Sequence, residues 1–261
     1  MSTRAIIYAA GVGSRLGTDA DPAPKVLLEF AGRSLLARHV DSLTACGVTD
    51  IVVAVGHGAE LIEAALAGLT TTARTRTVYN PDYRQGSIVT QWSVREALGA
   101  GGDVLLMDAD VLYDKRLIER LLASPHANCF LLDRGIEPGE EPVKLCVKDG
   151  ALVDFRKIPE KEYDWCGESV GFFKLSEATA RRLVDATRVY IETGRTGEYY
   201  DEALRDLLIA DPPGSFGFED ITGLPWTEID FKEDIDFANR NVLGKLLDHP
   251  RAKPKLAIVG V

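Results

Sequence analysis

The chain has 261 residues, of which 46% are hydrophobic and 27% charged, and its 40 Asp and Glu against 30 Lys and Arg give a formal net charge of -10. This length and composition predict a single α/β domain over residues 1–246, with a substantial core, followed by a tail over residues 247–261. The acidic charge argues against nucleic acid as the main partner, and the absence of a long apolar run or a signal-peptide region predicts a cytoplasmic protein with no membrane span.

A short apolar strand and a loop of small residues open the chain. Residues 5–8 form a continuous apolar run, as expected of a strand that is buried on both faces. Small side chains in the next loop leave its backbone open to a ligand, at Ala9, Ala10, Gly11 and Gly13. Arg15 can add positive charge, and Lys25 can return to the same anion after a proline-containing segment. The stretch therefore predicts a clamp for a triphosphate.

Two better-known glycine motifs do not fit this loop. A dinucleotide fingerprint needs GxGxxG, but the sixth place counted from Gly11 is Leu16, and Gly17 comes one position late. A P-loop would need GK followed by Ser or Thr, which does not occur. The alternative interpretation is a tight strand-to-helix turn whose glycines only supply positive φ.

Helical and strand patterns then alternate. Apolar residues at helical spacing predict helices over residues 34–46 and 59–69, and apolar runs predict strands over residues 51–55 and 76–79. Such alternation implies a mostly parallel sheet with helices on both faces. His57 has no visible nucleophile to serve, so we expect a structural or peripheral role for it.

The segment DVLLMDADVLY, residues 103–113, follows a helical run over residues 88–98 and is the second strong signal. It predicts a core strand that ends in Asp108 and Asp110, two acids on the same side of an extended chain. The carboxyl end of such a strand is where ligands usually bind in an open α/β sheet, and a carboxylate there suits Mg2+. Asp114 is predicted to cap the helix that follows.

The second half of the domain changes character. Strand patterns over residues 128–133, 143–148 and 152–157 predict antiparallel pairing, with Asp149-Gly150 as a two-residue hairpin turn. The remaining predicted elements are amphipathic helices over residues 177–189 and 198–209, strands over residues 215–220 and 226–230, and a final helix over residues 232–246.

The tail over residues 247–261 contains a Lys- and Pro-rich linker and a short apolar end. Disorder, an added edge strand and burial against another subunit all stay open for it, so a homo-oligomer is one of the expectations. The cysteines are far apart and form no CxxC pair, which predicts reduced structural thiols at Cys46, Cys129, Cys146 and Cys166.

The chain resembles the nucleotidylyltransferases that join a phosphorylated small molecule to a nucleotide. Its loop reads AAGVGSRL and is followed by Pro24-Lys25, where that family has approximately AAGxGxRL and then PK. The similarity continues through KVLLEFAGRSLLARHVDSLTACGVTDIVVAVGH, NPDYRQGS, LLMDAD and WTEIDFKEDIDFA. The cytidylyltransferase branch, with its phosphocholine, inositol-phosphate and 2-aminoethylphosphonate enzymes, is the most similar.

This resemblance implies the nucleotide-diphospho-sugar transferase fold. That fold is a Rossmann-like three-layer α/β/α architecture with a mainly parallel twisted sheet, and a small antiparallel lid is expected over about residues 134–174. The resemblance also implies that Asp110 and Asp230 hold Mg2+, with Asp108 as a supporting acid. Arg15 and Lys25 complete the expected catalytic set by neutralising the phosphates.

The segment NPDYRQGS is expected, by the same resemblance, to meet the nucleotide base through Asn80, Gly86 and Ser87. The alternative is a turn at Pro81 and Gly86 in which Ser87 only caps a helix. The full nucleotide-binding set expected from the resemblance is Ala9, Ala10, Gly11, Gly13, Ser14, Arg15, Lys25, Asn80, Gly86, Ser87, Asp108 and Ala109.

The later half offers candidates for binding a second substrate. Lys144 and Lys157 are candidates for its phosphate, and Glu168 for a cationic headgroup. Tyr199 and Asp201 supply an aromatic and acidic surface for an ammonium group. Solvated strand edges and core packing are the alternative interpretations of these residues.

The predicted function is a Mg2+-dependent cytidylyltransferase that joins CTP to a small phosphate- or phosphonate-bearing substrate, of the phosphocholine or 2-aminoethylphosphonate type, and releases pyrophosphate. The nearest alternative is a sugar-1-phosphate or inositol-phosphate nucleotidylyltransferase, because the phosphate-binding residues would be shared. An alternative of another class is a non-catalytic nucleotide-binding regulator. The sequence leaves the headgroup of the second substrate open.

Overall fold

The computed structural model describes residues 3–13, 15–16, 23–135 and 142–246. The expected loop residue Ser14 and the tail over residues 247–261 lie outside the described residues. Among the helices that are described, none combines the length and the apolar character that crossing a membrane requires. Cys46, Cys129, Cys146 and Cys166 are free cysteines in the structure.

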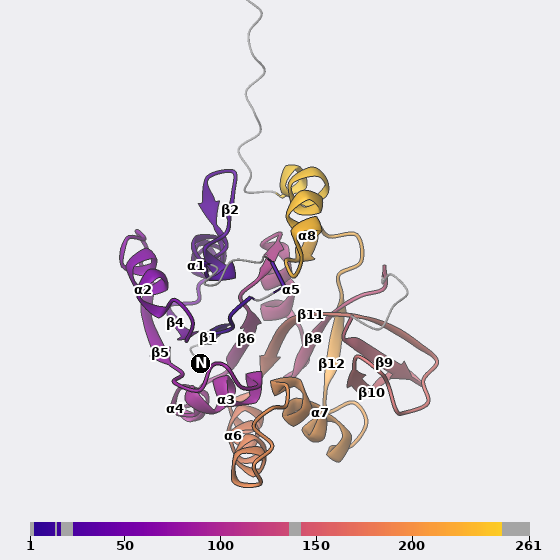
Figure 1. Ribbon diagram of the computed structural model, residues 1–261. Coiled ribbons are helices and arrows are strands. Elements are labelled where there is room, and N and C mark those ends of the chain that lie inside the picture. The colour runs from indigo at the N-terminus through magenta and orange to yellow at the C-terminus, as the bar shows by residue number, and fades with distance from the viewer. Residues whose placement is uncertain (1–2, 14, 17–22, 136–141, 247–261) are drawn as a thin grey trace, which may run out of the picture.

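The elements alternate between strand and helix in the first half of the chain (Figure 1). The strands are β1 Arg4–Ala9, β2 Glu29–Phe30, β3 Arg33–Ser34, β4 Asp50–Val55, β5 Arg74–Tyr79, β6 Val104–Asp108, β7 Val111–Tyr113, β8 Cys129–Asp133, β9 Lys144–Lys148, β10 Ala151–Arg156, β11 Trp165–Leu175, β12 Gly217–Asp220 and β13 Trp226–Glu228. The α-helices are α1 Leu35–Ala45, α2 Ala59–Ala67, α3 Ser87–Ser93, α4 Arg95–Gly99, α5 Arg116–Ala123, α6 Glu177–Glu192, α7 Tyr200–Ala210 and α8 Lys232–Phe237.

The central sheet has the strand order β10-β9-β11-β6-β1-β4-β5, and β8 and β12 extend it from β11. Its core strands β6, β1, β4 and β5 are mutually parallel, because each is connected to the next through a crossover that contains helices. Strands β8 to β11 add antiparallel pairs to the same sheet. The predicted mixed α/β fold with a mainly parallel central sheet is therefore confirmed.

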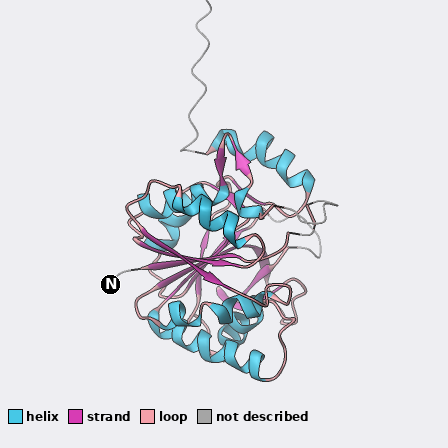
Figure 2. Ribbon diagram, turned by 60° about the vertical axis from the view of Figure 1, so that its left-hand side comes forward, coloured by secondary structure: helices cyan, strands magenta, loops and turns pink. Residues whose placement is uncertain are grey.

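Helices cover both faces of the sheet, so the domain has three layers (Figure 2). Side chains alternate along β1: Ile7 packs in the layer with α1, α2 and α5, and Ile6 in the layer with α3, α4, α6 and α7. Both side chains are completely buried. Burial of one such side chain contributes roughly 1.5–3 kcal/mol to folding, which explains why strands of this kind read as continuous apolar runs.

The antiparallel strands follow the predicted turn. Asp149 and Gly150 have φ angles of 50° and 79°, as the type I′ turn of a two-residue hairpin requires, and β9 and β10 pair on either side of them. The long strand β11 was not separated as an element in the sequence. It pairs with β6, β8 and β9 and so joins the antiparallel strands to the core sheet. A lid role for residues 134–174 stays a prediction.

Two predicted helices are interrupted. The run over residues 88–98 divides into α3 and α4 at Val94, whose φ of -92° and ψ of 11° break the series of helical hydrogen bonds. The helix over residues 232–246 continues from α8 as a π turn, Ala238–Val242, and a 3-10 turn, Leu243–Lys245. Asp114 does act at the start of α5, because its Oδ1 accepts a 3.0 Å hydrogen bond from the backbone N–H of Arg116.

Candidate active site

A cavity of about 1250 Å3 opens at the carboxyl ends of the parallel strands. The loop after β1, the loop before α3 and the end of β6 form one part of its wall. The end of β10, the middle of β11, the start of α7 and the segment around β13 form the rest. Ligands of open α/β sheets bind at this edge, because helix N-termini and loop side chains converge there.

A smaller pocket of about 230 Å3 adjoins the small-residue loop. It collects most of the predicted phosphate and metal residues, namely Ala9, Gly11, Gly13, Arg15, Lys25, Ala109, Asp110 and Asp230. Gly13 has a φ of 66°, and a Cβ added there would lie 3.0 Å from Cγ of Lys25. Glycine therefore lets the Lys25 side chain pass close to the loop. Ala10 accepts a hydrogen bond of 3.1 Å from the backbone N–H of His57, which ties the loop to the segment after β4.

Lys25 lies between two carboxylates. Its Nζ donates to Oδ2 of Asp110 at 3.0 Å and to Oδ1 of Asp230 at 2.5 Å, and Nη1 of Arg15 reaches Oδ2 of Asp230 at 3.4 Å. Burial by itself lowers the pKa of Lys25, but Asp110 and Asp230 more than offset this, so the pKa is raised and the ammonium stays charged. The pocket thus already places a cation between the two acids.

The pairing of β13 with β7 brings Asp230 to Asp110. In this antiparallel pair Glu228 lies opposite Val111, and the backbone N–H of Ile229 donates to the carbonyl of Asp110 at 2.9 Å. The next turn is fixed by Asp234, whose Oδ2 accepts from the backbone N–H of Asp230 at 2.8 Å. Backbone bonds on both sides therefore hold the Asp230 carboxylate toward the pocket.

Glu228 is a third acid that the sequence analysis missed. Carboxylate oxygens of Asp110, Glu228 and Asp230 all lie within 4.8 Å of one another. Surrounding protein atoms, then repulsion from Asp110 and Asp230, raise the pKa of Glu228 to about 8, although its side chain keeps contact with solvent. The signal was present: Glu228 and Asp230 are two positions apart in an extended segment and so lie on one side of it.

The three acids fit a hard divalent cation. Mg2+ takes oxygen ligands and is usually held by one or two carboxylates together with phosphate and water. Burial and then repulsion from Asp110 and Asp230 raise the pKa of Glu228, and a bound cation would offset that repulsion. Asp110 and Asp230 are the predicted ligands, and Glu228 is a third acid close enough to hold the same ion.

Asp108 faces a different part of the cavity from Asp110. The hydroxyl of Tyr200 donates to both of its carboxylate oxygens at 2.9 Å, and the Tyr200 ring packs on Tyr8 at 4.8 Å. Burial and then the neighbouring Asp110 raise the pKa of Asp108 well above its ordinary value. Asp108 is thus a packed acid that fixes Tyr200 in the cavity wall.

Of the three residues predicted to meet the base, Ser87 lines the cavity, whereas Asn80 and Gly86 are not among its lining residues. Asn80 is buried, and its side chain is used within the protein: Nδ2 donates to Thr90, and Oδ1 accepts from the backbone N–H of Asp82. Gly86 lies against the 197–198 backbone, where an added Cβ would come within 2.2 Å of a carbonyl oxygen. Ser87 lines the cavity and accepts from the backbone N–H of Tyr200 at 2.9 Å.

The same loop presents other side chains to the cavity, which the sequence analysis did not single out. They are Tyr83, Arg84 and Gln85, and Thr90 of α3 lines the cavity beside them. The polar and aromatic composition of NPDYRQGS was the available signal, but only the tertiary structure shows which of its side chains face inward.

Four of the five candidates for the second substrate line the large cavity, and they are Lys157, Glu168, Tyr199 and Asp201. The fifth, Lys144, directs Nζ to the carbonyl oxygens of Pro142 at 3.4 Å and Lys157 at 2.7 Å. Burial and then the adjacent Glu202 raise the pKa of Asp201 to about 7. Asp201 can therefore change its charge near neutral pH.

Comparison with known proteins places this geometry among the nucleotidyltransferases. Residues 5–154 match the family described as the MobA-like NTP transferase domain. The CMP-5'-(3-aminopropyl)phosphonate synthase of Streptomyces rubellomurinus is 30% identical over 233 residues, which cover 87% of this chain and 37% of that protein. The bifunctional IPC transferase and DIPP synthase of Rubrobacter xylanophilus is 30% identical over 247 residues, covering 92% and 52%. The chain thus spans about half or less of the length of these relatives.

Two solved structures share the fold. The CTP:phosphocholine cytidylyltransferase of Streptococcus pneumoniae matches with a TM-score of 0.72 and 21% identity, covering 92% of this chain and 98% of that one. The inositol-1-phosphate CTP transferase of T. maritima matches with a TM-score of 0.70 and 19% identity, covering 89% and 91%.

Proposed function

The chain belongs to the MobA-like NTP transferase family, and from this premise we propose that it is a Mg2+-dependent cytidylyltransferase. It joins CTP to a small substrate that carries a phosphate or phosphonate, and it releases pyrophosphate. The observation that carries the proposal is the convergence of Lys25, Asp110 and Asp230 beside the small-residue loop, at the carboxyl ends of the parallel strands. The CMP-linked product named for the Streptomyces relative and the CTP-using activities of the two structural neighbours support the choice of CTP.

In the proposed reaction, an oxygen of the substrate's phosphate or phosphonate attacks the α-phosphorus of CTP in line, and pyrophosphate leaves. No general base is needed, because the attacking oxygen is already anionic. Arg15 and Lys25 neutralise charge on the CTP phosphates and the departing pyrophosphate. Asp110 and Asp230, with Glu228, would hold the Mg2+ ion, which supplies further charge neutralisation between the two reactants when it is bound.

The second substrate is proposed to be a small zwitterion that carries an amine. Glu168 and Asp201 give the cavity wall an acidic character, and the exposed ring of Tyr199 lies at the start of α7 next to Asp201. A carboxylate and an aromatic face both favour an ammonium group over a neutral hydroxylated ring. The CMP-5'-(3-aminopropyl)phosphonate synthase of Streptomyces rubellomurinus, whose product carries an amine and a phosphonate, supports this class.

An inositol-phosphate or sugar-1-phosphate substrate is the second candidate. It is favoured by the IPC transferase relative and by the inositol-1-phosphate neighbour. A non-catalytic nucleotide-binding regulator is a weaker alternative. A protein that only binds a nucleotide has no need of a cation and three acids gathered at the position of the phosphates.

The decisive experiment is to incubate the purified protein with Mg2+, each of the four ribonucleoside triphosphates and a panel of acceptors, and to measure pyrophosphate release. The panel contains phosphocholine, 2-aminoethylphosphonate, 3-aminopropylphosphonate, inositol 1-phosphate and glucose 1-phosphate. We expect turnover with CTP and an amine-bearing acceptor. Turnover only with another nucleotide, or no turnover with any pair, would reject the proposed function.

A further inference from the structure

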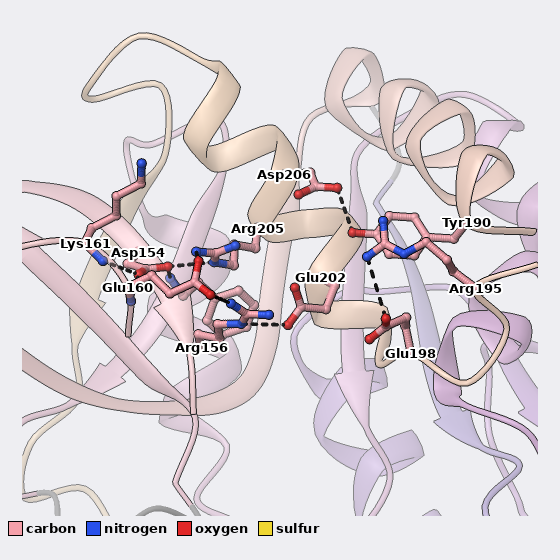
Figure 3. A network of polar contacts seen from close by, with 11 residues as sticks. Asp154, Arg156, Glu160, Lys161, Tyr190, Arg195, Glu198, Glu202, Arg205 and Asp206 are labelled. Carbon is pink, nitrogen blue, oxygen red and sulfur yellow. Dashed lines mark hydrogen bonds and ion pairs between the residues drawn. The ribbon is translucent and has the colours of Figure 1, made fainter. Parts of the chain in front are cut away.

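A cluster of ion pairs joins the end of β10 and the turn after it to the first half of α7 (Figure 3). The cluster contains two arginines and three acids from separate parts of the chain. We call it the β10–α7 cluster, and its members are Asp154, Arg156, Glu160, Glu202 and Arg205. None of these side chains is among the residues that line the cavity, so the proposed reaction leaves the cluster unexplained.

Asp154 is the centre of the cluster and is completely buried. Its Oδ1 accepts from Nε of Arg205 at 2.7 Å, and its Oδ2 accepts from the backbone N–H groups of Glu160 at 2.7 Å and Lys161 at 2.9 Å. A single carboxylate therefore closes the turn over residues 157–161 and fixes it to α7. Arg205 also donates from Nη2 to Oε2 of Glu160 at 3.0 Å. The guanidinium group therefore binds Asp154 before the turn and Glu160 within it.

Arg156 makes a second bridge between the same two segments. Its Nε donates to Oε1 of Glu202 at 3.1 Å, and its Nη1 pairs with Glu160. Glu202 lies in the first turn of α7, whereas Arg205 lies one turn further along. The ion pairs Arg156–Glu202 and Arg205–Asp154 lie about one helical turn apart along α7. Together they fix both the distance and the rotation of α7 relative to β10.

The cavity side of these segments carries candidate substrate residues. Phe155 in β10 and Lys157 directly after it alternate with the cluster residues Asp154 and Arg156, and both line the cavity. Tyr200 and Asp201 begin α7 immediately before Glu202, and both line the cavity as well. The β10–α7 cluster thus lies next to Lys157, a cation that follows β10, and next to Asp201, an acid at the start of α7, and both of these residues line the cavity.

We propose that Arg156 and Arg205 are positioning residues that set the separation of Lys157 and Asp201 across the second-substrate end of the cavity. Lys157 faces the phosphate or phosphonate of the substrate and Asp201 faces its ammonium group, so a fixed separation selects substrates by the length between their charges. This inference rests on the proposed function. In this proposal the β10–α7 cluster determines which acceptor is preferred and does not affect the binding of CTP.

The test compares steady-state kinetics of Arg156→Met and Arg205→Lys with those of Arg182→Met. Arg156 is partly exposed, so its loss is compatible with folding, and Arg205→Lys keeps the charge but cannot reproduce the fork. Arg182 is the matched control, because it holds Asp211 at the opposite end of α7 through two bonds of 2.7 and 2.6 Å.

We expect both cluster variants to raise KM for the acceptor about tenfold, with KM for CTP within about twofold of the parent value, and Arg182→Met to change neither. The preference between 2-aminoethylphosphonate and 3-aminopropylphosphonate should shrink in the cluster variants. If Arg156 acts through Lys157, the effects of Arg156→Met and Lys157→Met on acceptor KM will not add in the double variant.

Hydrogen exchange supplies a readout that is independent of turnover. The amides of Glu160 and Lys161 should exchange faster in Arg205→Lys than in the parent, while those of β1 stay protected. A parent protein that releases pyrophosphate with none of the acceptors rejects the proposed function and this inference with it. An active parent whose cluster variants leave acceptor KM and acceptor preference unchanged, or raise both KM values equally, rejects the inference alone.

Discussion

Nζ of Lys25 lies 3.0 Å from Oδ2 of Asp110 although the two residues are 85 positions apart in the chain. The same ammonium lies 2.5 Å from Asp230, at a separation of 205 positions. One cation therefore bridges an acid from the middle of the chain, Asp110, and an acid near the C-terminal end of the described residues, Asp230. A divalent metal that enters between the two acids must displace the Lys25 ammonium or share the carboxylates with it. Metal binding therefore affects the position from which Lys25 can reach a phosphate.

Replacement of Lys25 tests the phosphate clamp. Lys25→Ala should lower turnover by on the order of 10² to 10³-fold, because a fixed charge that stabilises the developing phosphate charge is lost. The measurement is pyrophosphate release at saturating Mg2+, with circular dichroism to verify folding. Lys148→Ala is the control, since Lys148 pairs with an exposed Glu162. Parent-level turnover in a folded Lys25→Ala protein would remove Lys25 from the mechanism.

The third acid of the candidate metal site gives a second prediction. Glu228→Gln should raise the Mg2+ concentration for half-maximal turnover by about tenfold or more, because the side chain at position 228 can no longer lose a proton to become a charged ligand when the ion binds. Asp110→Asn should have the larger effect. Direct Mn2+ titration followed by electron paramagnetic resonance measures the same change without catalysis. Equal metal affinity in the parent, Glu228→Gln and the surface control Glu162→Gln would exclude Glu228 from the site.

Asp201 predicts a pH dependence of stability. Its pKa is raised from 3.8 to about 7 in the folded protein, so between these values the folded state holds a proton that the unfolded state has lost. Stability therefore falls as pH rises from about 4 to 7, by the linkage between proton binding and unfolding. Urea unfolding of the parent and Asp201→Asn at pH 4.5 and 7.5 should show a smaller decline in the variant. Identical declines would contradict the raised pKa.

The same group predicts a pH dependence of substrate binding. KM for an amine-bearing acceptor should fall as pH rises through about 7, because Asp201 gains the negative charge that attracts the ammonium group. Steady-state kinetics between pH 6 and 8 measures this, and Asp201→Asn is the reference that keeps every other titration, including that of the acceptor's phosphate or phosphonate. KM values that follow the same pH curve in both proteins would assign the ammonium group to another residue.

The close contact between Gly171 and the Asp108 side chain leaves no room for a larger residue at position 171. A Cβ at position 171 would lie 2.1 Å from Oδ2 of Asp108, and φ of Gly171 is 76°. Gly171→Ala should therefore lose more stability than Gly214→Ala, since Gly214 has a φ of 88° but nothing within 4 Å of an added Cβ. We expect the difference to be about 1–3 kcal/mol in urea unfolding, the usual cost of overpacking. Equal losses would mean that only backbone strain matters at Gly171.

Much of the fold was predictable from local patterns. The apolar runs at β1 and β4 and the helical spacing of apolar residues in α1 identify buried faces. This works because the spacing of apolar residues along an element indicates which of its faces is buried. Asp149 and Gly150 predict their hairpin, since few residue pairs accept two positive φ angles in succession. The length and partners of β11 were not predictable. It pairs with three strands that belong to different parts of the chain.

The sequence by itself determined the small-residue loop, its two cations and the acid at the end of β6, because each lies in one short segment whose composition limits what it can bind. Only the tertiary structure decided that Glu228 joins Asp110 and Asp230, that Asn80 turns into the protein, and that Lys144 bonds to backbone carbonyls. The physical reason is that these outcomes depend on pairings such as β13 with β7. The energy of such a pairing comes from contacts between distant segments and leaves no periodic trace in either one.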